Sequence, residues 1–399
     1  MTEATGPLQG LRVIELGVLL AGPFCGQILG DLGAEVIKVE PPGQGDPLRQ
    51  WGTVKKDGHG LWFPIVGRNK TCVTIDLRQA EGQAIVKDLV READFLLENF
   101  RPGTLEKWGL DYETLAAINP RLIMIRVSGY GQTGPNSPKA GYASVGEAMG
   151  GMRYVMGEPD RMPSRAGISI GDSLAATYAA IGALAALEHR HRTGKGQIVD
   201  SAIYEACFAM MESLIPDYHF GGYIRERTGS FLPKIAPSNI YPASDGMVII
   251  AANQDTVWRR LAEAMGRAEL ADDPRFLTHV ARGEHQGELD GLISAWSSQM
   301  TIAELEACCE DHGVPCGRIY RAPDMLADPH FAARQAIVEV DHPQLGPFPM
   351  PAVFPKLSAT PGNVRWTGPE LGSHTEAVLR DLLGYSPDKI AHLRTSGVI

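Results

Sequence analysis

The stretch LRVIELGVLLAGPFCGQILGDLGAEVIKVE, residues 11–40, decides the fold. Residues 11–16 form a short apolar run, which is typical of a buried strand. Residues 24–33 are compatible with a helix that stops at Gly33, and residues 34–40 form a second apolar run that ends in an acid. The stretch therefore predicts one β-α-β unit.

The same alternation continues along the chain. Residues 71–77 predict a strand, residues 80–93 a helix, and residues 94–99 and 122–131 two further strands. Strands that alternate with helices favour a parallel sheet with helices on both faces. We therefore expect an α/β fold with a doubly wound, mostly parallel sheet.

The amino-acid composition changes in the second half of the chain. Residues 220–246 are rich in Gly, Pro and Ser, as linkers and lids are, and a new strand and amphipathic helices follow them. From about residue 324 the chain becomes Pro-rich and then ends in a last helix. These shifts predict a large domain of residues 1–205 plus 325–399, with a linker and a smaller α+β domain over 206–324.

Composition sets limits on the function. The 399 residues suffice for two cores, and 44% hydrophobic with 21% charged residues is ordinary for a soluble globular protein. The formal net charge of -10 provides no sequence-wide basic field for a nucleic-acid backbone. The first residues lack the basic and apolar regions of a signal peptide. We expect a cytoplasmic protein with neither nucleic-acid nor membrane partners.

Metal and disulfide chemistry have little support in the sequence. The six cysteines include no C-x-x-C pair, which argues against a zinc cage and a disulfide framework. His189 and His191 are two residues apart on a predicted helix, so their side chains diverge. No metal site is predicted.

A G-x-S-x-G pattern runs through Gly167, Ser169 and Gly171. In a hydrolase, such a serine follows directly on a buried apolar strand. The residues before this pattern, GEPDRMPSRA, are polar and broken by prolines. We therefore do not expect a nucleophilic serine.

Asp172 directly follows that pattern and opens a predicted helix, rich in Ala and Leu, that stops at Gly194. Asp172 could be only an N-cap, a role that contributes about 1 kcal/mol. The positive end of the helix dipole could equally hold an ionised carboxylate that attacks a thioester, with Gly167 and Gly171 leaving space for a substrate. The residues alone leave both roles open.

Five segments together carry a resemblance to a known family: GLRVIELGVLLAGPFCGQILGDLGAEVIKVEPPGQGDPLR, GRNKTCVTIDLR, ENFRPGTLEKWGLDYETLAAINPRLI, GISIGDSLAATYAAIGALAAL and RTGKGQIVDSAIYEA. They resemble the family III CoA-transferases, which include formyl-CoA transferase and carnitine CoA-transferase. The resemblance covers essentially the whole chain. It implies a two-domain subunit in an interlocked homodimer, and it matches Asp172 to the catalytic aspartate.

The resemblance also implies a mechanism. The aspartate attacks an acyl-CoA donor to give a mixed anhydride, the CoA thiolate returns to form an aspartyl-CoA thioester, and a carboxylic acid acceptor finally receives CoA. CoA and acyl-CoA are then substrates, and no prosthetic group is implied. The implied CoA contacts are Leu20, Ala21, Lys38, Ile75, Arg78, Asn99, Phe100, Arg101, Lys107, Ala140, Gly141 and Tyr142.

The sequence also departs from formyl-CoA transferase. Leu20 replaces a glutamine near the active carboxylate, Pro41 an arginine that contacts a CoA phosphate, and Ala140 a lysine. The glycine run of that enzyme's lid is absent, and residues 227–241 occupy the region. These departures argue against oxalate and formyl-CoA as substrates.

The acceptor acid is suggested by two arginines. Arg49 and Arg165 are candidates to pair with a substrate carboxylate because a guanidinium fork matches its geometry. A structural or surface role is open for each. The resemblance places Trp51 near the acyl pocket. We therefore expect a dicarboxylate acceptor, such as succinate, mesaconate, itaconate or a glutarate derivative, with succinyl-CoA or a similar ester as donor.

Three alternatives stay open at this stage. An α-methylacyl-CoA racemase shares the fold but needs a second base, a histidine in a GHD segment, where residues 141–143 here read GYA. A non-catalytic CoA-binding protein would be marked by loss of the aspartate. A nicotinamide-dependent oxidoreductase would need G-x-G-x-x-G after the first strand, and residues 15–26 lack that spacing.

Overall fold

Six strands form the central sheet in the order β5-β2-β1-β6-β7-β8. They are β1 (Arg12–Glu15), β2 (Glu35–Glu40), β5 (Lys70–Thr74), β6 (Phe95–Glu98), β7 (Ile123–Ser128) and β8 (Ile198–Ala202). Every neighbouring pair in this sheet is parallel. Counted along the chain the order is 3-2-1-4-5-6, the doubly wound order, which reverses between β1 and β6. The predicted sheet type is confirmed.

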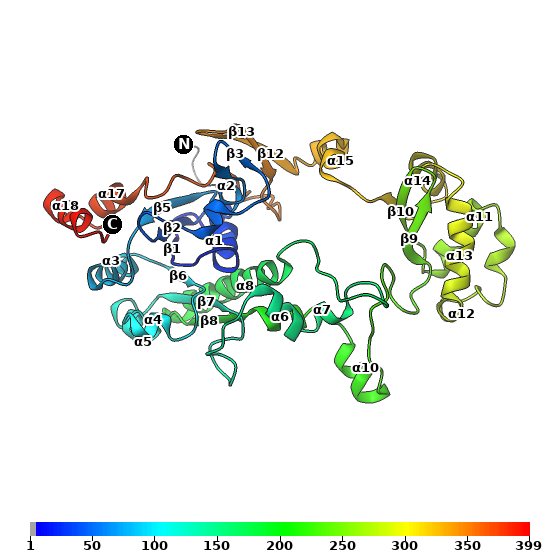
Figure 1. The fold of residues 1–399 in the computed structure, drawn as a ribbon, viewed down its shortest axis with the longest axis horizontal. Helices are drawn as coiled ribbons and strands as arrows, with labels where there is room; N and C mark the ends of the chain where they lie inside the picture. The colour runs from blue at the N-terminus through cyan, green and yellow to red at the C-terminus, as the bar shows by residue number, and fades with distance from the viewer. Residues whose placement is uncertain (1–4) are drawn as a thin grey trace. The chain divides into compact units, whose positions relative to one another are not determined.

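The structure is a computed structural model, and it describes residues 5–399. The chain divides into two units (Figure 1). The first comprises the described residues up to Met152 with Ala166–Pro216 and His330–Ile399, and the second comprises Arg153–Arg165 and Asp217–Pro329. The sequence predicted domain boundaries at residues 205 and 324. No feature of the sequence indicated that Arg153–Arg165 group with the second unit.

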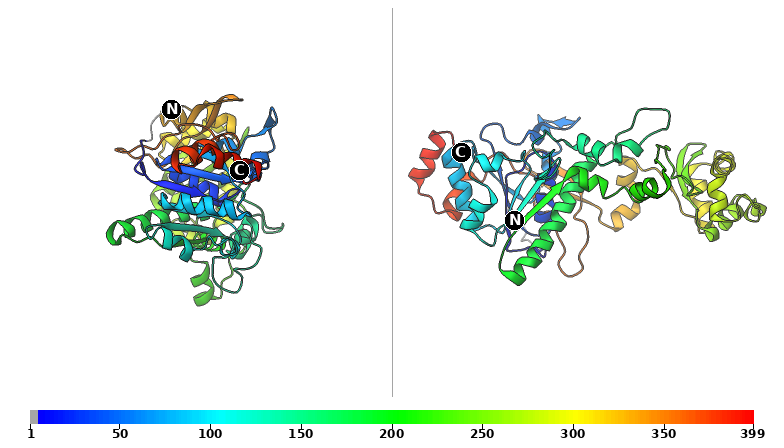
Figure 2. Two further views of the ribbon diagram at one scale, coloured as in Figure 1. Left: turned by 90° about the vertical axis from the view of Figure 1, so that its left-hand side faces the viewer. Right: turned by 90° about the horizontal axis from the view of Figure 1, so that it is seen from below.

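Helices cover both faces of the central sheet (Figures 1 and 2). α1 (Ala21–Asp31) and α8 (Ile170–Thr193) lie on one face, and α3 (Ala80–Arg91) lies on the other with α5 (Tyr112–Ile118) and the C-terminal α18 (Pro387–Thr395). On that second face α3 buries Ile85, Val86, Leu89 and Val90, one side of an amphipathic helix. The hydroxyl of Tyr385 donates to Asp88 at 2.6 Å, so the C-terminal segment is fastened to α3.

Helix α8 has the length and apolar composition of a membrane-spanning helix. Nine of its residues are nevertheless buried within the unit. One of these is Arg190, whose guanidinium contacts the Asp94 carboxylate at 2.8 Å. Contacts of this kind identify α8 as a core helix that closes with Gly194 in the left-handed conformation (φ 76).

Two parts of the first unit were not predicted from the sequence. Strand β8 completes the sheet, and a hairpin of β12 (Ile337–His342) and β13 (Gly346–Pro351) lies within the Pro-rich segment. Prolines 347, 349 and 351 of β13 oppose Asp341, Glu339 and Ile337. Alternate N–H groups of an edge strand point away from its partner, so prolines at alternate positions remove no ladder hydrogen bond.

The second unit is smaller and mixed. Its antiparallel sheet has the order β11-β10-β9, from Cys316–Arg318, Gly246–Ala251 and Ser238–Ala243. It packs with α11 (Asp255–Ala264), α13 (Gln286–Ser297) and α14 (Ile302–Asp311) around a core that includes Trp258 and Leu305. The predicted α+β class of the smaller part is confirmed.

Short elements complete the described chain. They are η1 (Pro47–Gln50), β3 (Lys55–Lys56), β4 (His59–Gly60), α2 (Phe63–Val66), α4 (Thr104–Lys107), α6 (Ala143–Met149), α7 (Met152–Val155), α9 (Ile203–Phe208), α10 (Leu214–Gly221), η2 (Ala268–Ala271), α12 (His279–Glu284), α15 (Ala322–Ala327), α16 (Pro329–Ala333), α17 (Thr375–Ala377) and the π-helical η3 (Val378–Leu382).

Candidate active site

Two loops meet at the carboxyl ends of β1 and β6, where the strand order reverses. The Asn99 side chain joins them, because its Oδ1 accepts from the Val18 N–H at 2.8 Å and its Nδ2 donates to the Val18 carbonyl at 2.9 Å. A Cβ on Gly17 would lie 2.9 Å from Asn99 Oδ1, so the approach requires glycine. Open α/β sheets bind their ligands at this reversal point.

Several residues with expected nucleotide contacts lie around this junction. Leu20 is the N-cap of α1 and Ala21 is its first residue. The Phe100 N–H donates to the Glu98 carboxylate at 2.7 Å, and Arg101 Nε donates to the Pro138 carbonyl at 2.7 Å. The Arg101 bond brings the turn at residues 99–101 together with the loop that leads to Tyr142.

That loop carries the expected contacts Ala140, Gly141 and Tyr142. A Cβ on Gly129, directly after β7, would lie 2.7 Å from the Gly141 Cα, so the two backbones cross at glycines. Tyr142 is 53% exposed and therefore available to a ligand.

The remaining expected contacts differ in exposure. Ile75 is buried, whereas Lys107 is exposed. The Arg78 side chain is exposed and pairs with Asp76 at 2.8 Å. A surface pair of this kind costs little to open, so Arg78 can reorient toward a phosphate.

Asp172 is the third residue of α8 and is half-buried. The N-cap is Ser169, so the interpretation of Asp172 as the cap residue is wrong by one helical turn. Residues 161–169 include no strand, which confirms that Ser169 does not stand on a strand-to-helix elbow.

Gly171 has a different role from the predicted one. A Cβ there would lie 3.1 Å from Glu147 Cγ and 3.1 Å from Ile203 Cγ2. Gly171 therefore allows the first turn of α8 to pack tightly on α6 and α9, and it opens no space for a substrate.

The electrostatic surroundings of Asp172 favour a carboxylate nucleophile over a thiolate. Partial burial, together with the Asp172 charge, raises the pKa of Tyr142. Burial, followed by the charges of Glu147 and Asp172, raises the pKa of Cys207 to about 11. Tyr142 and Cys207 therefore stay protonated near neutral pH, while the positive end of α8 favours ionised Asp172.

The charged residues Lys38 and Arg49 are engaged within the first unit. Arg49 donates to both oxygens of Glu40 at 2.6 and 2.7 Å and to the Pro369 carbonyl at 3.0 Å. Lys38 is buried. The Arg49 fork is thus occupied by Glu40 and is not available to a substrate carboxylate.

The other two expected substrate contacts, Trp51 and Arg165, belong to different units of the chain. Trp51 is half-buried and meets Trp62 edge-on, with ring centroids 6.0 Å apart. Arg165 is exposed and closes the first segment of the second unit. The role of Arg165 stays a prediction from the sequence.

Glu98 is expected to make the stability of the fold depend on pH. Burial raises the pKa of Glu98 from 4.5 to about 7, against the opposing effects of Arg126 and the Phe100 N–H. Folded Glu98 therefore binds its proton more tightly than the unfolded chain does. Stability should rise as the pH falls from about 7 to 4.5, by at most about 1.4 kcal/mol per pH unit from this group.

The Glu98→Gln variant tests this prediction. Denaturant unfolding between pH 5 and 8 should show a flatter pH dependence for the variant than for the unsubstituted chain. Identical slopes for the two proteins would contradict the raised pKa of Glu98.

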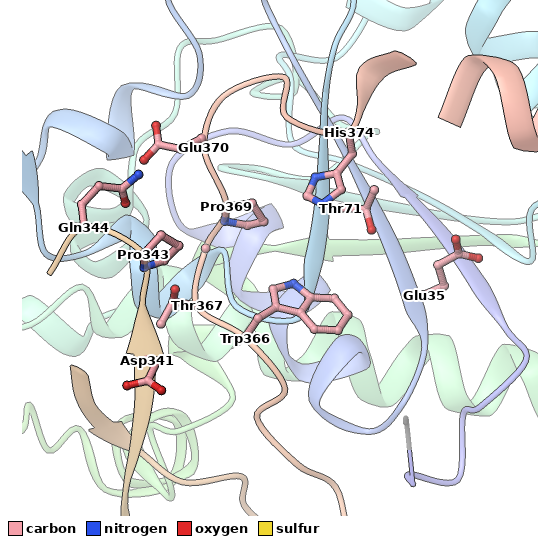
Figure 3. A pocket seen from close by; sticks show the side chains of 11 residues that line it. Glu35, Thr71, Asp341, Pro343, Gln344, Trp366, Thr367, Pro369, Glu370 and His374 are labelled. Atoms are coloured by element: carbon pink, nitrogen blue, oxygen red, sulfur yellow. The ribbon is translucent and has the colours of Figure 1, made fainter. Parts of the chain in front are cut away.

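A pocket of about 510 Å³ lies elsewhere in the first unit (Figure 3). Its side chains come from the amino ends of β2 and β5, from the end of β12 and the turn after it, and from residues 366–374. They include Glu35, Asp341, Trp366 and His374. None of the expected site residues lines it. Across residues 5–399, no group of three or more His, Cys, Asp or Glu side chains is arranged to hold a metal.

Comparisons with known proteins agree with this geometry. The model of CoA-transferase family III matches residues 8–375. The chain is 61% identical over 394 residues to succinyl-CoA–D-citramalate CoA-transferase of Chloroflexus aurantiacus, covering 98% of each chain. It is 42% identical to the beta subunit of succinyl-CoA–L-malate CoA-transferase of that organism, covering 100% and 99%.

A solved structure supports the fold independently. A CAIB/BAIF family protein from Brucella suis superposes with a TM-score of 0.84 at 38% identity, covering 95% of this chain and 100% of the other. Family match, relatives and fold agree over nearly the whole length. The chain belongs to CoA-transferase family III.

Proposed function

We propose that this enzyme transfers CoA from succinyl-CoA to a dicarboxylic acid, with a hydroxylated acid of the citramalate or malate type as the best candidate acceptor. The observation that carries the proposal is Asp172 on the first turn of α8, in a chain 61% identical to a citramalate CoA-transferase. The donor and acceptor classes come from the names of the relatives.

In the proposed mechanism Asp172 is the nucleophile. One carboxylate oxygen attacks the thioester carbon of the donor, the C–S bond breaks, and a mixed anhydride and CoA thiolate form. The thiolate then attacks the Asp172 carbonyl, which releases succinate and leaves an aspartyl-CoA thioester. N–H groups at the start of α8 are suited to stabilise the oxyanion that develops in each step.

The second half repeats the same chemistry with the acceptor. Its carboxylate attacks the aspartyl-CoA thioester, which gives a second anhydride and frees the thiolate. The thiolate attacks the acceptor's acyl carbon, the new acyl-CoA leaves, and the Asp172 carboxylate is regenerated. Both halves consume and release only the two acids and CoA.

The nucleotide end of CoA is proposed to bind at the reversal point between β1 and β6. Backbone groups near Leu20 and Ala21, the turn at residues 99–101, and the cations Arg78 and Lys107 would hold it. Tyr142 would lie along the pantetheine arm, which its exposure and the effect of the Asp172 charge on its pKa support.

Arg165 is proposed to pair with the carboxylate of the acceptor that does not react. Arg165→Met should raise the KM for the acceptor by about tenfold or more, since a charged hydrogen bond contributes about 1.5–3 kcal/mol. The KM for succinyl-CoA should change less than twofold. Initial rates with each substrate varied in turn would measure both constants.

A matched control is Arg161→Met, which removes another exposed arginine of the same segment. It should leave both constants unchanged. An unchanged acceptor KM in Arg165→Met would remove Arg165 from the substrate site.

We also propose a cytoplasmic homodimer with interlocked subunits. The observation that supports a partner subunit is an apolar strip of α8, in which Tyr178, Ile181 and Leu184 are 38%, 55% and 38% exposed. A helix that leaves such residues uncovered is a candidate contact surface.

The test of the function is product analysis. The purified enzyme is mixed with succinyl-CoA and one acid at a time: D-citramalate, L-malate, glutarate, itaconate or mesaconate. The CoA esters that form are separated and identified by mass spectrometry. The expected result is transfer of CoA to a dicarboxylate, with release of an equimolar amount of succinate. Release of free CoA alone, or epimerised esters without transfer, would overturn the proposal.

A further inference from the structure

Lys38 lies beneath the loop that follows β1. Its side chain is 1% exposed, and its ammonium donates to the Gly17 carbonyl at 2.9 Å. The same nitrogen lies 2.8 Å from Asp46 Oδ2 and 3.1 Å from Glu15 Oε1. An ammonium has three protons, so these three oxygens use its whole donor capacity. Lys38 has none left for a phosphate.

Asp46 continues the connection to the backbone. Its carboxylate accepts from the N–H of Leu19 at 3.0 Å and from the N–H of Leu48 at 2.9 Å. Asp46 is 1% exposed, and the Lys38 charge together with the hydrogen bonds lowers its pKa despite burial. The carboxylate therefore stays ionised and joins residues 17–20 to η1, which directly precedes Trp51.

Leu19 has a backbone conformation that needs such support. Its φ is 63°, in the left-handed region that leucine rarely adopts. A strained residue persists only where its surroundings fix it. The two groups that hold it are the Asp46 carboxylate on the Leu19 N–H and the Asn99 side chain on Val18.

We propose that the buried Lys38–Asp46 pair is a positioning device that fixes the left-handed turn at Leu19 and so presents the backbone at Leu20 and Ala21 to the nucleotide of CoA. The inference rests on the proposed function, because it assigns the loop a nucleotide ligand. Both residues act through the loop and touch no substrate.

The positioning role predicts a loss of affinity with little loss of turnover. Asp46→Ala should raise the Kd for CoA at least tenfold and raise the Kd for adenosine 3′,5′-bisphosphate by the same factor, since the loop contacts the nucleotide end. The kcat at saturating succinyl-CoA should change less than threefold. Lys38→Met should change the same constants in the same direction.

The controls separate positioning from general loss of structure. Asp31 is also buried and accepts from Arg68 and Asn69 at the other end of α1. Asp31→Ala should lower the melting temperature comparably yet leave the CoA Kd within twofold. If Asp46→Ala does not fold, Lys38→Met serves in its place, because it removes the same buried pair from the lysine side.

Rescue provides a second readout. Glycine adopts a positive φ without the leucine penalty. Adding Leu19→Gly to Asp46→Ala should therefore recover at least threefold of the lost CoA affinity, a gain that a merely structural role of Asp46 would not give.

Calorimetric titration of CoA and the bisphosphate into each variant measures these effects. Equal CoA affinity in Asp46→Ala and the unsubstituted enzyme, or an equal loss in Asp31→Ala, would overturn the positioning role. If the unsubstituted enzyme bound no CoA, the proposed function would fail instead, so the two failures are distinguishable.

Discussion

Replacing Asp172 with asparagine should abolish CoA transfer, with a fall in kcat on the order of 10⁴-fold or more, as when other covalent nucleophiles are removed. Asparagine keeps the size and the place of the side chain on the first turn of α8. Its amide cannot form the anhydride from which every later step of the proposed mechanism proceeds. Loss of the favourable charge at the helix start costs only about 0.3–1 kcal/mol, so the variant should fold.

Intact-protein mass spectrometry makes this prediction specific. The unsubstituted enzyme mixed with succinyl-CoA should carry an adduct of the mass of CoA less one water, which hydroxylamine removes, and Asp172→Asn should carry none. Glu188→Gln is the matched control, because Glu188 lies on the same helix, is exposed and pairs with His191 and Arg192 of that helix. That variant should keep both turnover and adduct. An adduct that persisted in Asp172→Asn would place the nucleophile elsewhere.

The fold was predictable where apolar residues recur along the sequence with the period of a strand or a helix. Residues 11–40 place apolar side chains so regularly that β1, α1 and β2 follow within a few residues. Strand β8 was missed because IVDSA at residues 198–202 is short and only partly apolar. Strand β13 was missed because prolines usually mark loops, and only its pairing to a single partner makes them compatible with a strand.

The site was predictable only in part, because ion pairs between residues far apart in the sequence cannot be recognised from the sequence. Asp172 could be proposed from its place near the start of a predicted helix and from the family resemblance. Arg49 and Lys38 looked available to substrate and nucleotide in the sequence, yet the fold pairs them with Glu40, Asp46 and Glu15. Nothing local in a sequence states which cation a distant carboxylate neutralises.

Glu15 shows how strongly the first unit depends on such pairing. Its carboxylate lies between two ammonium groups, 3.1 Å from Lys38 and 2.8 Å from Lys70, and all three side chains are at most 1% exposed. Helix α1 passes so close that a Cβ on Gly26 would lie 1.8 Å from Glu15 Oε2. Glu15 thus compensates the desolvated Lys70 and shares Lys38 with Asp46, in a space with no room for rearrangement.

Glu15→Gln should therefore lower the free energy of unfolding by about 3–5 kcal/mol, the usual result of leaving buried charge uncompensated. Glutamine keeps the shape, so the loss reports charge. Glu35→Gln is the comparison, because Glu35 is half-exposed beside Arg12 and its loss should cost about 0–1 kcal/mol. Urea unfolding of both variants at pH 7 measures the difference, and a loss below 1 kcal/mol in Glu15→Gln would contradict the argument.

The pH dependence of Glu15→Gln separates charge from packing. Burial lowers the pKa of Lys70, and the Glu15 charge opposes that effect. Without Glu15 the pKa of folded Lys70 should fall further below that of the unfolded chain, so the folded state releases its proton first as the pH rises. Stability then increases with pH over that interval, and the deficit of the variant should narrow as the pH rises toward 10.5. A packing defect would give a deficit that stays constant over the same range, because no proton would be exchanged on folding.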